Sequence, residues 1–224
     1  MNTYQLEIAC FNLESALIAQ SNGADRIELC ANMQAGGTTP DPETVKAARK
    51  QLHIPLYVMI RPRGGDFVYS DAEFEQMKSE ILQFKTIQPD GFVFGILNAD
   101  GNINKPKNEA LIALANPLPC TFHRAFDVVG DVFRSLEDII DCGFKTILTS
   151  GQAQDVMQGL AVLTTLSEKA GNRITIMPGG GLRSSNCRAL KAKTNTGFYH
   201  SSAITDGSET ANGDEVKRLK ENLQ

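Results

Sequence analysis

Short apolar runs rich in β-branched and aromatic residues alternate along the chain with longer stretches of helical periodicity, and each pair fills about 25 to 30 residues. The runs predict eight strands, at residues 5–10, 26–30, 56–60, 91–95, 120–123, 146–150, 174–179 and 198–202. Strands that alternate strictly with helices form a parallel sheet covered by helices. The pattern therefore predicts the α/β class, and eight units favour a single-domain (β/α)8 barrel of the TIM type over residues 1–224.

Capping residues support this division of the chain. Polar residues that cap helices precede several apolar periodic stretches, and glycines follow three of them. An open, doubly wound sheet is the alternative arrangement, but it usually carries a glycine-rich phosphate loop after its first strand, where this chain reads CFNLES. The predicted helix starts are Asn12, Asp41 with Pro42, Ser70 and Asp155, and the predicted ends are Gly23, Gly143 and Gly171.

Composition narrows the classes of partner. Lys and Arg total 22 against 26 Asp and Glu, without a basic tail, so we expect no nucleic-acid partner. No apolar run approaches the ~20 residues that span a bilayer, and polar residues interrupt the first 20 positions, so we expect a cytoplasmic protein without a membrane partner. Five cysteines without C-x-x-C spacing argue against a disulfide framework and a structural zinc site.

Charged residues stand at the ends of three predicted strands. The two-residue period of a strand places Glu28, Arg61 and His123 on the lumen face, where charges can pair with one another or with a ligand. We expect these three side chains to meet at the carboxyl end of the barrel as one electrostatically coupled catalytic cluster. The alternative is a structural layer of ion pairs that fills the barrel.

The loops after these strands supply further candidates. In IRPRGGDF, Arg61 and Arg63 are predicted to hold a carboxylate or phosphate with their forked donors. In FHRAFD, His123 is a candidate acid, base or metal ligand, which Arg124 and Asp127 could orient.

Two neighbouring loops near the end of the chain predict an anion site. The seventh strand ends in PGGG and the eighth in HSSA. Barrels commonly bind phosphate on glycine-loop amides and hydroxyl groups at this position, although three glycines can also form a simple tight turn. The predicted ligands are the amides of Gly179, Gly180 and Gly181 with Ser201 or Ser202.

Eight ordered motifs together resemble the CutC family of copper homeostasis proteins. They are LESA, GADRIELC, GGTTP, IRPRGGDF-YSD, FGIL-DG, TFHRAFD, ILTSG and MPGGG, and they run through nearly the whole chain. The resemblance implies a cytoplasmic TIM-type barrel, a homo-oligomer and a role in copper handling.

Copper(I) prefers thiolate and thioether ligands, and Cys10, Cys30, Met33 and Met59 lie near strand ends. We predict Cys30, within the matched motif, as a copper ligand, with Cys10 or a nearby methionine as the second donor. Ala9 stands where family members often have a cysteine. The alternative is that Cys30 is a small buried residue that packs under a helix.

Three functions remain open from the sequence. The first is a copper(I) binder that uses Cys30. The second is an enzyme acting on a small anionic or phosphorylated substrate, with His123 as acid or base, Glu28 as its partner, and Arg61 and Arg63 on the anion. The third is an inert scaffold that mediates oligomerisation. No lysine lies at a predicted strand end, which argues against a Schiff-base aldolase, and three histidines are few for a hydrolytic zinc site.

Overall fold

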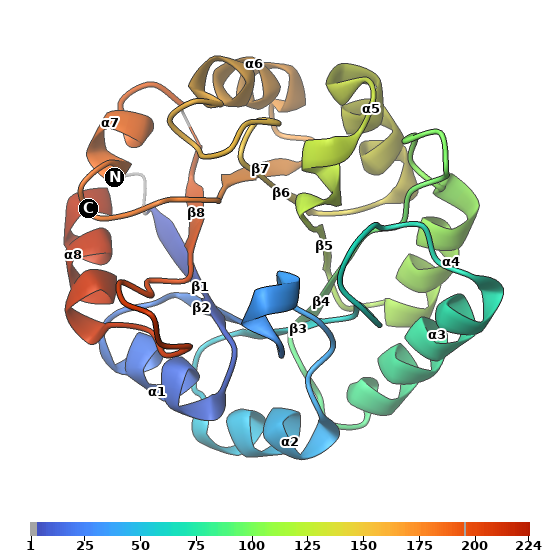
Figure 1. Ribbon diagram of the computed structural model, residues 1–224, viewed down its shortest axis with the longest axis horizontal. Helices are drawn as coiled ribbons and strands as arrows, with labels where there is room; N and C mark the ends of the chain where they lie inside the picture. Colours follow the sequence, from blue (N-terminus) through green and yellow to red (C-terminus); the bar gives the residue numbers. More distant parts are fainter. Residues whose placement is uncertain (1–3, 195) are drawn as a thin grey trace.

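The computed structural model describes residues 4–194 and 196–224, in which eight parallel strands alternate with helices around a barrel (Figure 1). The sheet order is β7-β6-β5-β4-β3-β2-β1-β8, so the first strand pairs with the last and the sheet curls almost closed. The strands are β1 (Gln5–Cys10), β2 (Arg26–Leu29), β3 (Leu56–Met59), β4 (Gly91–Phe94), β5 (Cys120–Phe122), β6 (Thr146–Thr149), β7 (Thr175–Pro178) and β8 (Phe198–Ser201). All eight predicted strands are therefore present, and the predicted barrel is confirmed.

The helices form a ring outside the strands, as Figure 1 shows. They are α1 (Leu13–Ser21), α2 (Pro42–Gln51), α3 (Asp71–Lys85), α4 (Lys105–Ala115), α5 (Val132–Cys142), α6 (Leu160–Ala170), α7 (Cys187–Lys191) and α8 (Gly213–Leu223). Two short 3-10 helices, η1 (Met33–Ala35) and η2 (Arg124–Val128), lie in the loops after β2 and β5. None of the helices in the described part of the chain is long and apolar enough to cross a membrane.

Three of the four predicted helix starts are confirmed. The side chain of Asn12 accepts a hydrogen bond from the amide of Ser15, and Asp41 caps α2 in the same way. Ser70 and Glu73 form a reciprocal capping box at the start of α3. These caps satisfy amides that the first helical turn leaves without partners.

The predicted start at Asp155 is wrong. The Asp155 carboxylate accepts hydrogen bonds from the amides of Met157 and Gln158, and α6 begins only at Leu160. Gly159 lies directly before α6, and its backbone contacts the Ser150 carbonyl. A Cβ at this position would overlap the carbonyl oxygen, so glycine is required there. Asp155 therefore caps a separate turn before the helix.

Side chains alternate between the two faces of the barrel wall. In β1, Leu6, Ile8 and Cys10 belong to the apolar core between strands and helices, whereas Glu7 and Ala9 face the lumen. The outer face of the strands is therefore apolar, and the buried charges gather inside.

Four buried side chains fill the lumen at the amino-terminal side of the barrel. The Arg26 guanidinium lies between the rings of Tyr57 and Phe198, 4.0 and 4.1 Å from their centroids, and its Nη2 is 3.4 Å from Met177 Sδ. The Tyr57 ring occupies the space that a side chain at Gly91 would need. Arg26, Tyr57, Met177 and Phe198, which we call the lumen floor, are each 8% exposed or less.

Candidate functional site

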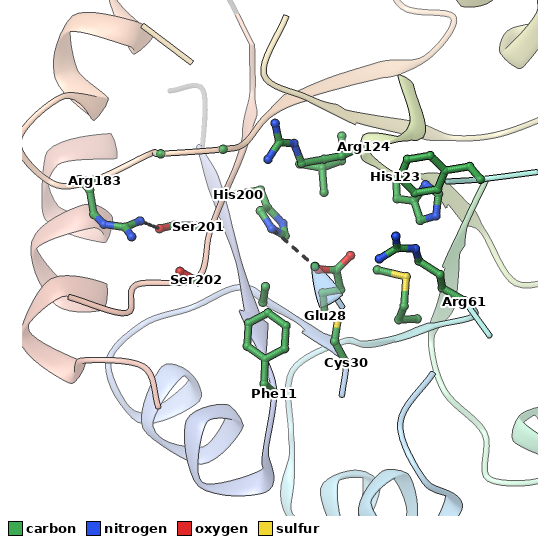
Figure 2. A pocket seen from close by; sticks show the side chains of 17 residues that line it. Phe11, Glu28, Cys30, Arg61, His123, Arg124, Arg183, His200, Ser201 and Ser202 are labelled. Carbon is green, nitrogen blue, oxygen red and sulfur yellow. Dashed lines mark hydrogen bonds and ion pairs between the residues drawn. The ribbon is translucent and has the colours of Figure 1, made fainter. Parts of the chain in front are cut away.

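A pocket of about 200 Å³ opens above the lumen floor, at the carboxyl ends of the strands. Figure 2 shows side chains from opposite sides of the barrel that converge on it. Ten residues named as candidates from the sequence line this pocket: Glu28, Cys30, Met59, Arg61, His123, Arg124, Gly180, Gly181, Ser201 and Ser202. Cys10, Arg63 and Gly179 do not line it.

A chain of buried charged groups leads from the lumen floor into the pocket. Arg26 Nε donates a hydrogen bond to Glu7, whose other carboxylate oxygen lies 2.7 Å from His200 Nδ1. His200 Nε2 is 3.8 Å from Glu28 Oε2. The order of groups is therefore Arg26, Glu7, His200 and Glu28, with positive and acidic groups in alternation.

Burial and the neighbouring charges set the protonation states in this chain. Burial alone raises the pKa of Glu7, but Arg26 and His200 outweigh it and hold the pKa below its usual value. Burial alone lowers the pKa of His200, and the carboxylates of Glu28 and Glu7 outweigh that effect and raise it. Burial raises the pKa of Glu28 to about 7, against the opposing effect of His200. A pKa of about 7 therefore allows Glu28 to exchange a proton near neutral pH.

The expected pairing of Arg61 with Glu28 is absent from the contacts of the described residues. The Arg61 guanidinium donates to the carbonyl oxygens of Ala35, Gly37 and Gly65 at 2.7, 2.8 and 3.0 Å. These bonds hold the loops after β2 and β3 together, and they leave the charge of Arg61 without a carboxylate.

His123 lies in the pocket but is not paired with Glu28. Its Nδ1 accepts a hydrogen bond from the amide of Ala125 at 3.3 Å, and its ring packs on Phe67. Burial, followed by the positive charge of Arg61, lowers the pKa of His123 to about 3. The expected coupling therefore takes another form, in which Glu28 acts on His200 and Arg61 acts on His123.

Arg124 and Asp127 do not orient His123 as expected. Arg124 Nε donates to Asp127 at 2.7 Å, and its Nη2 donates to Ser150 Oγ at 3.0 Å. These contacts fix Arg124 at the rim of the pocket, where Figure 2 shows it above His200.

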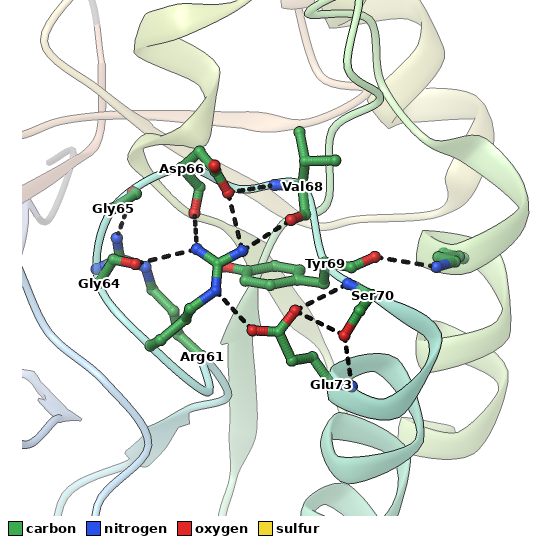
Figure 3. A network of polar contacts seen from close by, with 10 residues as sticks. Arg61, Gly64, Gly65, Asp66, Val68, Tyr69, Ser70 and Glu73 are labelled. Carbon is green, nitrogen blue, oxygen red and sulfur yellow. Dashed lines mark hydrogen bonds and ion pairs between the residues drawn. The ribbon is translucent and has the colours of Figure 1, made fainter.

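Arg63 does not line the pocket, and its partners Asp66 and Glu73 belong to the network of polar contacts in Figure 3. Its guanidinium pairs with Asp66 at 3.0 Å and with Glu73 at 2.6 Å, and it lies over the ring of Tyr69. Strand β3 ends at Met59 and an irregular loop follows, so the alternation of the strand does not extend to Arg63. Its contacts anchor the loop to the start of α3.

The two cysteines considered as copper ligands lie on opposite faces of the barrel wall. Cys10 belongs to the outer apolar core, and its thiol contacts the carbonyl of Ile8. Cys30 packs in the lumen with Met59 and lines the pocket. Burial, and then the carboxylate of Glu28, raises the pKa of the Cys30 thiol well above its usual value.

Some polar groups in the loops after β7 and β8 form hydrogen bonds within the protein, and others remain available to a ligand. The amide of Gly179 donates to the carbonyl of Thr149, and Ser201 Oγ donates to the carbonyl of Leu182. The amides of Gly180 and Gly181 donate no hydrogen bond within the described part of the chain. Gly180 and Gly181 have φ angles of +107° and +71°, which other residues rarely adopt.

Arg183 completes this end of the pocket. It donates to the carbonyls of Leu182 and Ile204 and to Ser201 Oγ, all neutral oxygen atoms. The sequence offered a weak signal for this residue, which follows the PGGG motif closely, and a weak signal for His200, which precedes the predicted serines. Neither signal revealed a contact, because His200 meets Glu7 of β1 and Glu28 of β2, and Arg183 meets Ser201 at the end of β8.

Glu7, Glu28 and His200 are also placed where they could hold a metal ion, since one ligand atom from each lies within 4.8 Å of the others. Both carboxylate oxygens of Glu7 are already engaged, one by Arg26 and one by His200. A metal ion would have to displace His200 from Glu7 and would lie near a guanidinium. The cluster therefore fits proton exchange better than metal binding.

Comparisons with known proteins agree on one family. The model of the CutC family matches residues 4–205. The human copper homeostasis protein cutC homolog is 44% identical over 202 residues, which cover 90% of this chain and 74% of that protein. The family protein CutC of Chromobacterium violaceum is 44% identical over 198 residues, 88% of this chain and 80% of its own. The crystal structure of CutC from Streptococcus agalactiae superposes with a TM-score of 0.86 at 35% identity, covering 91% of this chain and 100% of that one.

Proposed function

This chain belongs to the CutC family, and we propose that it acts in copper homeostasis by binding copper(I) at Cys30. The observation that carries the proposal is a soft donor pair on the pocket wall of a chain 44% identical to a human protein named for copper homeostasis. Copper(I) prefers sulfur ligands, and the thiol of Cys30 and the thioether of Met59 supply two of them.

The position of these two side chains supports a shared ion. Cys30 and Met59 belong to one small buried cluster with Tyr57 and Val93. A Cβ at Gly37 would lie 3.4 Å from Cys30 Sγ and 3.7 Å from Met59 Cε, so both side chains border the same small volume. The absence of a side chain at Gly37 leaves that volume open.

Binding at Cys30 should release the thiol proton. Because burial and Glu28 raise the pKa of this thiol, copper(I) must compete with a proton at neutral pH. We therefore expect the apparent affinity to rise by about tenfold for each unit of pH between pH 6 and pH 8.

The test is a competition titration of the reduced protein against a copper(I) chelator. We expect Cys30→Ser to bind at least about tenfold more weakly than the wild type, and Met59→Leu to weaken binding by a smaller factor. Cys142→Ser is the matched control, because Cys142 is a buried thiol on helix α5 outside the pocket. Equal affinities for the wild type and Cys30→Ser would remove Cys30 from the proposal.

A further inference from the structure

Unpartnered polar atoms gather in the pocket. Five buried side-chain atoms in the described residues have no hydrogen-bond partner, and three of them belong to pocket residues: Glu28 Oε1, Arg61 Nε and His123 Nε2. A buried polar atom without a hydrogen bond destabilises a fold, and native proteins usually provide it with a partner. Their concentration in one pocket indicates that a ligand completes these bonds.

The unpartnered atoms of Glu28 and His123 have complementary chemistry. His123 Nδ1 accepts a hydrogen bond from the amide of Ala125, which assigns the ring proton to Nε2 and makes that nitrogen a donor. The lowered pKa keeps this ring neutral. Glu28 Oε2 faces His200, and the carboxylate contacts the Cys30 thiol. Its Oε1 has no hydrogen-bond partner among the described residues and can accept a proton from a ligand. The pocket therefore offers one base, on strand β2, and one neutral hydrogen-bond donor, directly after strand β5.

The charges of the pocket favour an anion. Arg61 and Arg183 donate only to neutral oxygen atoms among the described contacts, so no carboxylate neutralises either guanidinium. Near Arg183, the amides of Gly180 and Gly181 remain available. Guanidinium groups and consecutive backbone amides are the donors that proteins use for phosphate.

The size and arrangement of the pocket restrict the ligand. A volume of about 200 Å³ is smaller than the about 300–1,000 Å³ of most ligand pockets, which suits a short-chain phosphate ester. Figure 2 shows Arg183 on one side of the pocket and His123 on the other, with Glu28 between them. A ligand anchored by its phosphate near Arg183 would therefore place its other end near Glu28 and His123.

We propose that this pocket binds a short phosphorylated hydroxyaldehyde or hydroxyketone, and that Glu28 and His123 interconvert the two forms. This activity goes beyond copper binding and does not depend on it. The phosphate is held by Arg183 and the amides of Gly180 and Gly181. The carbonyl oxygen accepts a hydrogen bond from His123 Nε2.

The reaction is a proton shift. Glu28 takes the proton from the carbon beside the carbonyl group, the C–H electron pair forms a carbon–carbon double bond, and the carbonyl electron pair moves to the oxygen that His123 faces. Glu28 then returns the proton to the former carbonyl carbon, while the hydroxyl proton moves to the other oxygen. Atoms and electrons balance within the substrate, so the step needs no oxidant or reductant.

The first test measures binding of 2-phosphoglycolate, which carries a phosphate and a carboxylate in place of the reactive end. Calorimetry should show tighter binding than for glycolate, and Arg183→Met should weaken it at least tenfold. Arg124→Met, at the rim, provides a second variant if Arg183→Met folds poorly. Arg173→Met is the matched control, because Arg173 pairs with Glu137 on the surface and does not line the pocket.

Equal binding of glycolate and 2-phosphoglycolate, or affinities unchanged in both arginine variants of the pocket, would overturn the phosphate site.

The second test measures proton transfer directly. Glyceraldehyde 3-phosphate, erythrose 4-phosphate and ribose 5-phosphate are incubated with the protein in D₂O, and proton NMR follows loss of the signal from the hydrogen beside the carbonyl group. At least one compound should exchange, and Glu28→Gln should slow that exchange at least 100-fold while Arg173→Met leaves it unchanged. Binding of 2-phosphoglycolate without exchange of any of the three compounds would overturn the reaction. The copper titration at Cys30 is a separate measurement, and its result bears on neither test.

Discussion

Replacing Arg26 with methionine tests whether the buried ion pair beneath the site stabilises the barrel. Glu7 is 0% exposed and Arg26 is 6% exposed, so neither charge is solvated by bulk water. Arg26 Nε donates to Glu7, and the Arg26 guanidinium also stacks between the rings of Tyr57 and Phe198. Methionine retains most of the apolar packing and removes the charge.

We expect Arg26→Met to lower the free energy of unfolding by about 3 kcal/mol at pH 7, because loss of one partner from a buried pair typically costs about 3–5 kcal/mol. The value lies at the lower end because His200 Nδ1 remains 2.7 Å from the Glu7 carboxylate. Loss of the two cation–π contacts is partly offset by the packing of the methionine thioether against the same rings.

The pH dependence of this effect has a definite sign. In the wild type Arg26 and His200 hold the pKa of Glu7 below its usual value despite burial, so the stabilisation from Glu7 is present above its unfolded pKa and is lost as the pH falls through the folded one. In Arg26→Met, burial is less opposed, and the Glu7 pKa rises. Protonation of Glu7 then relieves part of the cost, so the difference between wild type and variant should shrink by about 1 kcal/mol between pH 7 and pH 5.

Urea unfolding followed by circular dichroism measures these differences. The double variant Glu7→Gln/Arg26→Met should recover about 1 kcal/mol or more of the loss, because no unpaired carboxylate remains buried. Arg173→Met, at an exposed ion pair, should change the free energy of unfolding far less than Arg26→Met. A loss below about 1 kcal/mol in Arg26→Met, or no recovery in the double variant, would refute the assignment of a stabilising buried pair.

Two further predictions concern the pocket and its surroundings. Glu28→Gln should lower the pKa of His200 and leave the pKa of His123 unchanged, because Glu28 raises the pKa of His200 and does not act on His123. An NMR titration of the two rings measures both values. A shift in the pKa of His123 alone would contradict this arrangement. Arg63→Ala should leave the affinity for 2-phosphoglycolate unchanged, since Arg63 lies outside the pocket. It should lower the free energy of unfolding only slightly, because its ion pairs with Asp66 and Glu73 are partly exposed. Weaker binding would show that Arg63 reaches the ligand.

The barrel could be predicted because buried parallel strands are recognisable as short apolar runs and because helix caps require few residue types. The strand period also places Glu28 in the lumen correctly. The strand period does not identify the partner of Glu28, because His200 lies on β8, far away in the sequence. The period no longer applies beyond the last residue of a strand. Arg61 and Arg63 are two residues apart, as two consecutive lumen residues are, but Arg61 lines the pocket and Arg63 does not. Whether an amide is free, as at Gly180, or bonded, as at Gly179, depends on the neighbouring strand and is not encoded locally.

The lumen floor closes the pocket on the side of the amino-terminal strand ends. Arg26, Tyr57 and Phe198 each lie two residues before a pocket residue on the same strand face, and each is 8% exposed or less, so they seal the barrel from below. A bound molecule can therefore leave only through the opening by which it entered. The next molecule must wait until that opening is clear, and an inhibitor large enough to lodge there would stop both arrival and departure without contacting Glu28.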